Sequence, residues 1–518
     1  MSVAPPRSTS LRRNAISVVL GRGASALMWV AVTPFTLARL GPERFGVWSL
    51  FFVFGGYAAA LDLGMAGGII RFVAVAAARG DRRAVRSVLM RSLAVSIGAG
   101  LIWCLGILVL RDAFLEVFHV PASIAPEVER SLLLFACSIL LFSGTQVLHG
   151  VLMGYQRLDL SNLYFFAGLV LHAVLLVWGL GRGFGLMAAA AAMASGHLLS
   201  GTLAAWSVSS AVKSTPESGS SEPVAWRELL GFGGTVQATS IVSVGQLQAG
   251  KVLLGTLGTL VWVTQFELGF RVANALSSLP ILVQGSVIPA AARASASGGV
   301  AEVREVYAWA CRWVFALAGV LMPGLWLVAP ALFTLWLGPG QAASVSAARA
   351  LAVSFALATL VGPATAVARG AGWPGLETAM FAAALGINLL ACLWCVPRFG
   401  PVGAAVSMAL GFALAGAGLI LVFSRRLGVS IGSSLGRVAA PRYLLPAGIA
   451  AGMWVLGAGR NVGTRSAALP ALVLQGGLFL LLVLGVTWPM GDSRAVWGWA
   501  RSRVLGAGGA ARALGGAP

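Results

Sequence analysis

Charged residues, lysine, tyrosine and cysteine are all scarce in this sequence of 518 residues. Only 10% of the residues are charged, whereas an average soluble domain carries about a quarter. Hydrophobic residues make up 58%, which is more apolar surface than a water-soluble fold can bury. The composition therefore excludes a soluble protein and predicts an integral membrane protein.

The few cysteines all lie inside apolar runs. Cys392 and Cys395 form a close pair, but no second pair completes a zinc-binding pattern. We expect the cysteines to behave as small buried hydrophobic residues, and we expect no metal and no other cofactor. The five are Cys104, Cys137, Cys311, Cys392 and Cys395.

Basic residues outnumber acidic ones by 36 to 16, which gives a net charge of +20. In a soluble protein this excess would indicate a nucleic-acid partner. Cytoplasmic loops of membrane proteins accumulate Lys and Arg, so we expect membrane lipid, and no nucleic acid, as the partner. Only Lys213 and Lys251 are lysines, and all other basic residues are arginines.

Apolar runs long enough to cross a bilayer recur along the whole chain. A helix needs about 20 such residues to span the hydrocarbon core. The runs predict an all-α, polytopic protein with about fourteen transmembrane helices. The predicted spans lie near residues 15–38, 47–70, 88–110, 131–152, 160–179, 185–209, 229–252, 261–290, 306–330, 347–370, 376–396, 403–423, 443–459 and 468–489.

The distribution of arginine predicts the orientation of these spans. The run from Arg79 to Arg86 and the segment from Arg293 to Arg304 lie on the same side as both termini. The positive-inside rule assigns that side to the cytoplasm, and an even number of spans agrees. The first apolar run has the length of a helix and no A-x-A cleavage site, so we interpret it as a span rather than a signal peptide.

Weak internal similarity at an offset of about 218 residues predicts two parallel repeats of six spans each. The matching positions are Leu40-Gly41 with Leu257-Gly258, Gly80 with Gly298, Arg86 with Arg304, Phe114 with Phe333, Tyr155 with Trp373, and Gly185 with Gly403. Transporters built from such repeats place the substrate site at the repeat interface.

This repeat predicts the domain organisation. The expected parts are an N-terminal six-helix lobe (1–209), a cytoplasmic linker (210–228), a C-terminal six-helix lobe (229–424), two additional transmembrane helices (425–489) and a basic cytoplasmic tail (490–518).

Four motifs resemble those of a known transporter family. The segment Leu37–Trp48 (LARLGPERFGVW) resembles the loop after the first helix of polysaccharide and O-antigen flippases. Leu61–Met65 with Arg71 is similar to their second helix, and Leu335–Gly338 and Phe399–Ala404 also fit the family pattern. The chain thus resembles the lipid-linked oligosaccharide flippases of the multidrug/oligosaccharidyl-lipid/polysaccharide exporter superfamily.

The resemblance implies two six-helix lobes arranged in a V and transport by alternating access. It implies a monomer in the bacterial inner (cytoplasmic) membrane that moves a polyprenyl-pyrophosphate-linked oligosaccharide for surface polysaccharide biosynthesis, such as lipopolysaccharide O-antigen or exopolysaccharide. A polysaccharide polymerase is an implied partner. The scarcity of acids inside the spans departs from the superfamily's ion-coupled members.

Basic residues inside the spans are candidates for a cationic substrate cavity, because a charge within the bilayer costs about 2.5–3.5 kcal/mol and marks function by default. Arg22 lies nine residues beyond Arg13 and Arg312 eight residues beyond Arg304, or roughly 14 and 12 Å deeper along a helix. Arginine suits bidentate phosphate contacts. The alternatives are helix–helix hydrogen bonds for Arg22 and snorkelling for Arg312 and for two further candidates, Arg71 and Lys251.

Glu267 and Arg271 are four residues apart and predict either an ion pair on one helix face or a protonation switch at Glu267 that frees Arg271 for an anion. Asp62, beside several glycines, is the second candidate for ion coupling, with helix packing as its alternative. The prolines at 34, 280, 289, 323, 330 and 363 predict kinked helices.

Two other functions remain open. A multidrug or organic-cation exporter of the same superfamily would be expected to have a more acidic cavity. A membrane polysaccharide polymerase or ligase would carry catalytic residues on a long external loop. The histidines are scattered, and no nucleophile–base pair is recognisable, so we expect no enzymatic activity; the four are His119, His149, His172 and His197.

Overall fold

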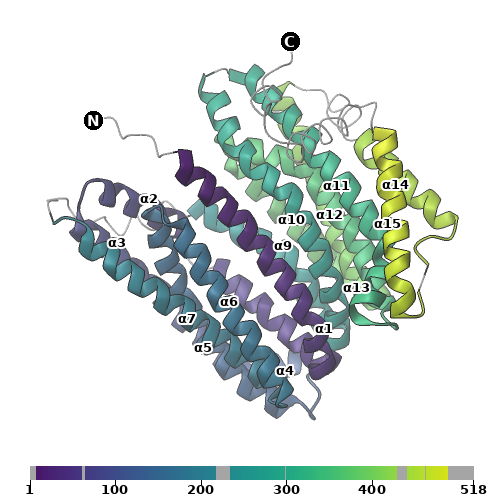
Figure 1. Cartoon of the computed structure of the whole chain (residues 1–518), viewed down its shortest axis with the longest axis horizontal. Coiled ribbons are helices and arrows are strands. Elements are labelled where there is room, and N and C mark those ends of the chain that lie inside the picture. Colours follow the sequence, from purple (N-terminus) through teal and green to yellow (C-terminus); the bar gives the residue numbers. More distant parts are fainter. Residues whose placement is uncertain are drawn as a thin grey trace. The chain divides into compact units, whose positions relative to one another are not determined.

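The computed structural model describes residues 8–60, 65–217, 234–297, 299–428, 440–460 and 462–487. The side chains of residues 8–24, 26–27, 58–60, 65–67 and 234–236 lie outside this description. Within the described ranges the chain forms fourteen α-helices and no strand, which confirms the all-α prediction (Figure 1).

The helices are α1 (Ser8–Ala60), α2 (Met65–Ala78), α3 (Arg82–Val109), α4 (Arg111–Val117), α5 (Ala125–Gly154), α6 (Leu158–Gly181), α7 (Gly185–Ser214), α9 (Gly234–Leu257), α10 (Leu260–Ser297), α11 (Gly299–Leu337), α12 (Ala342–Gly370), α13 (Pro374–Leu427), α14 (Ala440–Val455) and α15 (Arg465–Thr487).

Two of these helices are each divided by a glycine into two arms. Gly41 breaks α1 at φ 76° and ψ 169°, and Gly400 breaks α13 at φ 53° and ψ −129°, backbone conformations that only glycine adopts readily. A proline follows each break and starts the next arm with a suitable φ. Thirteen of the predicted spans each overlap one described helix or arm, whereas the span near 47–70 overlaps both the second arm of α1 and α2. Nine of the described helices are long and apolar enough to cross a membrane.

The segment Leu37–Trp48 forms the corner between the two arms of α1. Arg44 Nε donates to Glu127 Oε2 on α5 at 2.7 Å, which fixes the corner to its neighbour. A Cβ on Gly46 would lie 2.2 Å from the carbonyl oxygen of Leu260, so glycine permits the start of α10 to approach. Thr264 Oγ1 donates to the carbonyl oxygen of Pro42 at 2.5 Å. The motif thus specifies a tight junction of three helices.

The chain divides into two compact units. The first comprises residues 1–267 and 381–408, and within it α5, α6 and α7 pack side by side, with α3 against α5 (Figure 1). The second comprises 268–380 and 409–518, and within it α11 packs against α12, α14 and α15. These boundaries differ from those of the predicted lobes, which stay a prediction.

One arginine in each unit caps the end of a later helix. Arg82, at the start of α3, donates through Nε to the carbonyl oxygen of Thr215 at 2.8 Å and also hydrogen-bonds the Lys213 carbonyl, at the end of α7. Arg304, in the first turns of α11, donates through Nε to the carbonyl oxygen of Leu427 at 2.6 Å, the last residue of α13. Such carbonyls have no partner within their own helix. We call these two contacts the arginine caps.

An aromatic residue accompanies each arginine cap. Tyr155 lies in the turn after α5 and its hydroxyl is 2.9 Å from Thr215 Oγ1. Trp373 lies in the turn before α13, and the guanidinium of Arg426 lies 5.6 Å from its ring centroid. The two side chains make different contacts, so the correspondence of Tyr155 with Trp373 stays a prediction.

Other predicted repeat positions shift by a few residues. Arg82, not Arg86, makes the contact that corresponds to Arg304. Gly400, not Gly403, has the positive φ found at Gly185, because the backbone at the start of the following helix requires it. Gly298 lies outside the described residues, and the adjacent Gly299 has a positive φ like that of Gly80.

Candidate functional site

A cavity of about 240 Å³ lies inside the first unit, among α1, α5, α6 and α7. We call it the histidine cavity. Its lining is mainly aromatic and aliphatic, with a few neutral polar side chains. The lining residues are Trp29, Phe52, Phe142, Thr145, Gln146, Phe165, Gly168, Leu169, His172, Met193, Gly196, His197 and Ser200.

Two glycines allow α6 and α7 to cross closely beside this cavity. A Cβ on Gly168 would lie 2.4 Å from the carbonyl oxygen of Gly196, and a Cβ on Gly196 would lie 2.6 Å from that of Gly168. Small residues of this kind let the backbones of membrane helices approach. The crossing brings His172 of α6 and His197 of α7 to the same cavity.

Aromatic rings hold the cavity histidines in place. The ring of His172 meets that of Trp29 edge-on at 5.2 Å between centroids, and Trp29 meets Phe52 in the same way at 5.3 Å. His197 contacts Phe142 at 5.1 Å. Both arms of α1 therefore contribute to the wall on which the histidines pack.

The hydrogen bonding of the histidines differs. His149, just outside the lining, uses both ring nitrogens, with Nδ1 2.8 Å from Ser161 Oγ and Nε2 2.9 Å from Ser200 Oγ. His172 Nε2 and His197 Nε2 are buried and have no hydrogen-bond partner among the described residues. Because buried polar groups are normally paired, these two nitrogens are suited to bind a ligand.

An aromatic cavity with a few polar groups is the usual form of a site for a small organic molecule. The faces of Trp29, Phe52 and Phe142 can attract an organic cation through its interaction with the ring quadrupole. The nitrogens of His172 and His197 can donate or accept a hydrogen bond and thereby orient the ligand.

The structure brings together two of the predicted site residues, Lys251 and Glu267. Lys251 of α9 lies 2.6 Å from Glu267 of α10, and the two side chains are only 3% and 6% exposed. Snorkelling of Lys251 to the headgroups is therefore wrong, because the ammonium group is paired inside the first unit. The predicted pair of Glu267 with Arg271 stays a prediction.

A network of amides lies near this ion pair along α9. Asn388 Nδ2 donates to the main-chain oxygen of Gln246 at 3.1 Å and to its Oε1 at 3.2 Å. Gln246 Nε2 in turn lies 3.5 Å from the carbonyl oxygen of Met408. Both side chains are fully buried, so the network fixes α9 to the α13 segment of the first unit.

The remaining predicted site residues lie on separate helices. Arg71 is exposed on α2, and Arg271 is partly exposed on α10. Arg312 is partly exposed on α11, where its guanidinium lies 6.0 Å from the Trp313 ring. Arg22 belongs to α1 but its side chain lies outside the description, and Asp62 lies outside the described residues. Their roles in substrate binding and ion coupling stay predictions.

The histidine cavity was not predicted, because the histidines are far apart in the chain and were interpreted as scattered. A signal was present, since His172 follows Gly168 by one helical turn and His197 directly follows Gly196. A histidine beside a glycine in an apolar span is consistent with a polar group at a close helix crossing.

Comparison with known proteins agrees with this architecture. The MatE family model matches residues 24–178, which include most of the cavity lining. An inward-facing multidrug resistance MATE family transporter of the MOP superfamily superposes with a TM-score of 0.65 at 17% identity, covering 80% of this chain and 98% of its own. No curated protein sequence matches the chain.

A second solved structure is similar to the same extent. It is a MOP superfamily transporter from Pyrococcus furiosus, described as having a binding pocket of reverse polarity, with a TM-score of 0.63 at 18% identity over 81% of this chain and 95% of its own. At such identities the similarity shows the fold alone. The fold is that of the MATE transporters of the MOP superfamily.

Proposed function

We propose that this protein is a transporter, not an enzyme, that exports amphipathic organic compounds of the multidrug type across a bacterial cytoplasmic membrane by alternating access. The observation that carries the proposal is the histidine cavity, an aromatic site in which His172 Nε2 and His197 Nε2 have no hydrogen-bond partner among the described residues. Most of its lining, including His172 but not His197, lies in the segment that the MatE family model matches. Multidrug resistance is the function named for the similar inward-facing transporter.

The aromatic lining removes the main objection to a cationic substrate. A drug exporter was expected to have an acidic cavity, yet the described lining contains no carboxylate. Ring faces attract organic cations by about 0.5–2 kcal/mol each, so several rings can replace a counter-ion. Neutral amphipathic compounds would fit the same lining.

An efflux assay tests this function. Cells that lack their major exporters and produce this protein should accumulate less ethidium than cells without it. His172→Leu should raise the concentration needed for half-maximal efflux by about two- to tenfold, the effect of one neutral hydrogen bond. Equal ethidium accumulation with and without the protein would contradict the proposal.

The control is a histidine that lies away from the cavity. His119→Asn changes an exposed loop residue with a φ of 47°, a conformation that asparagine tolerates. This variant should transport like the wild type at equal protein abundance. An equal loss in both variants would remove His172 from the site.

A second candidate function is the flipping of a polyprenyl-pyrophosphate-linked oligosaccharide for surface polysaccharide. The observation that favours it is the sequence of the α1 corner, Leu37–Trp48, which resembles the corresponding loop of polysaccharide flippases. In that function Arg22, Arg71, Arg271, Arg312 and Lys251 would attract the pyrophosphate, with Asp62 and Glu267 as ion-coupling residues.

A further inference from the structure

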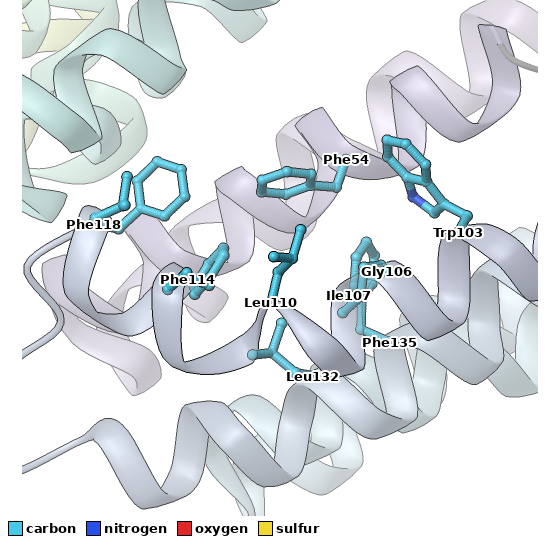
Figure 2. A pocket seen from close by; sticks show the side chains of 11 residues that line it. Phe54, Trp103, Gly106, Ile107, Leu110, Phe114, Phe118, Leu132 and Phe135 are labelled. Atoms are coloured by element: carbon cyan, nitrogen blue, oxygen red, sulfur yellow. The ribbon is translucent and has the colours of Figure 1, made fainter.

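A second cavity, of about 280 Å³, lies in the first unit between α3, α4, α5 and the second arm of α1 (Figure 2). We call it the apolar pocket. Only aliphatic and aromatic residues and one glycine line it. They are Phe54, Trp103, Gly106, Ile107, Leu110, Ala113, Phe114, Val117, Phe118, Leu132 and Phe135.

Stacked aromatic rings build the walls of the apolar pocket. Phe114 of α4 contacts Phe54 at 5.8 Å and Phe118 at 4.7 Å between centroids. Phe51, behind the pocket, stacks on Phe135 of α5 at 4.5 Å with an interplanar angle of 12°. Figure 2 shows that the labelled side chains of Phe54, Leu110, Phe114 and Phe118 surround a common space. The short helix α4 is thereby held over the end of the pocket.

One wall of the pocket has room for a further side chain. A Cβ on Gly106 would have no other atom within 4 Å. Around it, α3 exposes large apolar side chains, with Ile102 73% and Val109 78% exposed. In a membrane-spanning helix such a surface faces lipid. The apolar pocket is therefore continuous with the lipid-facing surface of α3.

The helix above the pocket carries charges of both signs. Arg111, Asp112 and Glu116 of α4 are exposed, and Arg111 Nε lies 3.3 Å from Asp112 Oδ1. The guanidinium can bind a phosphate, and the carboxylates can bind an ammonium group. This arrangement complements a zwitterionic headgroup rather than a purely anionic one.

We propose that the apolar pocket binds one acyl chain of a zwitterionic phospholipid, with the headgroup on the exposed face of α4. An empty apolar space of this size would forfeit dispersion contacts on every wall, whereas a hydrocarbon chain restores them. The chain enters from the lipid-facing side of α3, and phosphatidylethanolamine provides both charges that α4 can pair. This site is separate from the histidine cavity and does not depend on the transported substrate.

The test fills the pocket by substitution. Gly106→Leu places a side chain in the open space without meeting a neighbour at Cβ. The matched control is Gly98→Leu, on the same helix and also with no atom within 4 Å of its Cβ, but outside the pocket lining. Both substitutions replace a helical glycine and gain helix propensity equally.

The measurement is photo-crosslinking of the full-length protein in vesicles that contain phosphatidylethanolamine with a diazirine on one acyl chain. Wild type and Gly98→Leu should be labelled on residues 103–118, and Gly106→Leu should lose that label by about tenfold, equivalent to about 1.4 kcal/mol of binding free energy. Label absent from 103–118, or undiminished in Gly106→Leu, would overturn the proposal.

A competition arm identifies the occupant. Unlabelled phosphatidylethanolamine should displace the label from residues 103–118 more effectively than a polyprenyl phosphate or ethidium does. Stronger displacement by either of these two would assign the pocket to a substrate and would overturn the phospholipid assignment.

Discussion

Lys251 and Glu267 form an ion pair that is almost fully removed from solvent. Burying two charges is costly, and their mutual attraction offsets this cost only while both partners are present. The pair joins α9 to the beginning of α10, next to the junction with the corner of α1. Its first consequence is therefore structural, since it positions three helices in the first unit.

Removing both partners should lower the free energy of unfolding by less than the two separate removals added together. We expect Lys251→Met and Glu267→Gln each to lower the free energy of unfolding by about 3–5 kcal/mol, because each removes the opposite charge from a buried ionic group. The double variant should lose less free energy of unfolding than the sum of the losses in the two single variants. Thermal unfolding of the purified protein in detergent measures all three variants, and a double-mutant cycle gives the coupling.

Strict additivity of the two substitutions would contradict a direct ion pair. Lys213→Met is the matched control, because this lysine side chain is exposed at the end of α7. Only its main-chain oxygen takes part in the arginine cap. The free energy of unfolding of Lys213→Met should remain within about 0.5 kcal/mol of that of the wild type.

The sequence identifies which charges are deep in the membrane but not which of them meet. Residues four apart on one helix lie on the same face, so the spacing predicts a pair of Glu267 with Arg271. This reasoning considers only one helix. The partner that the structure shows, Lys251, lies on the preceding helix. His172 and His197 were missed for the same reason, since the crossing at Gly168 and Gly196 is a tertiary contact.

The helical elements were largely predictable, because each span is an apolar run of sufficient length. The break at Gly41 agrees with the Gly-Pro sequence. The structure shows that a single residue with non-helical dihedral angles, Gly41, separates the two arms of α1. The helix α4 was not predicted, since it lies between the predicted spans near 88–110 and 131–152. Its seven residues are too few for an apolar run, and aromatic contacts to α1 stabilise it.

The arginine caps are the clearest repeated feature of the helices. We expect Arg82→Ala to loosen the end of α7 and Arg304→Ala to loosen the end of α13. Losing hydrogen bonds from a charged donor costs about 1–3 kcal/mol, so amide exchange in the affected last turn should accelerate by about fivefold to a hundredfold. Hydrogen exchange read by mass spectrometry resolves the two helix ends separately.

Arg83→Ala is the control for the first cap, because Arg83 is exposed and adjacent in sequence. Exchange at the end of α7 should be unchanged in this variant. If Arg82→Ala also left that exchange unchanged, the cap would not hold the helix end.

Burial raises the pKa of Tyr155, and its hydrogen bond with Thr215 and the nearby Arg82 oppose this shift. The phenol therefore stays protonated at neutral pH and able to donate.

The chain has the fold of MATE transporters over about 80% of its length, and the sequence predicts the same all-α, polytopic fold class. The resemblance favoured a lipid-linked oligosaccharide as cargo, whereas the similar solved transporter is named for multidrug resistance. The motif at the α1 corner favours the flippases by resemblance alone, because its described contacts form a helix junction and not the lining of a substrate site.

Transport by the purified protein in vesicles distinguishes export of an organic cation from flipping of a lipid-linked sugar. Vesicles should be prepared with an organic cation on one side and a prenyl-pyrophosphate-linked sugar in one leaflet, and with wild type, His172→Leu or His119→Asn. We expect protein-dependent flux of the cation that falls in His172→Leu and persists in His119→Asn. Transfer of the lipid-linked sugar without cation flux, unaffected by His172→Leu, would contradict this expectation and establish the flippase function instead.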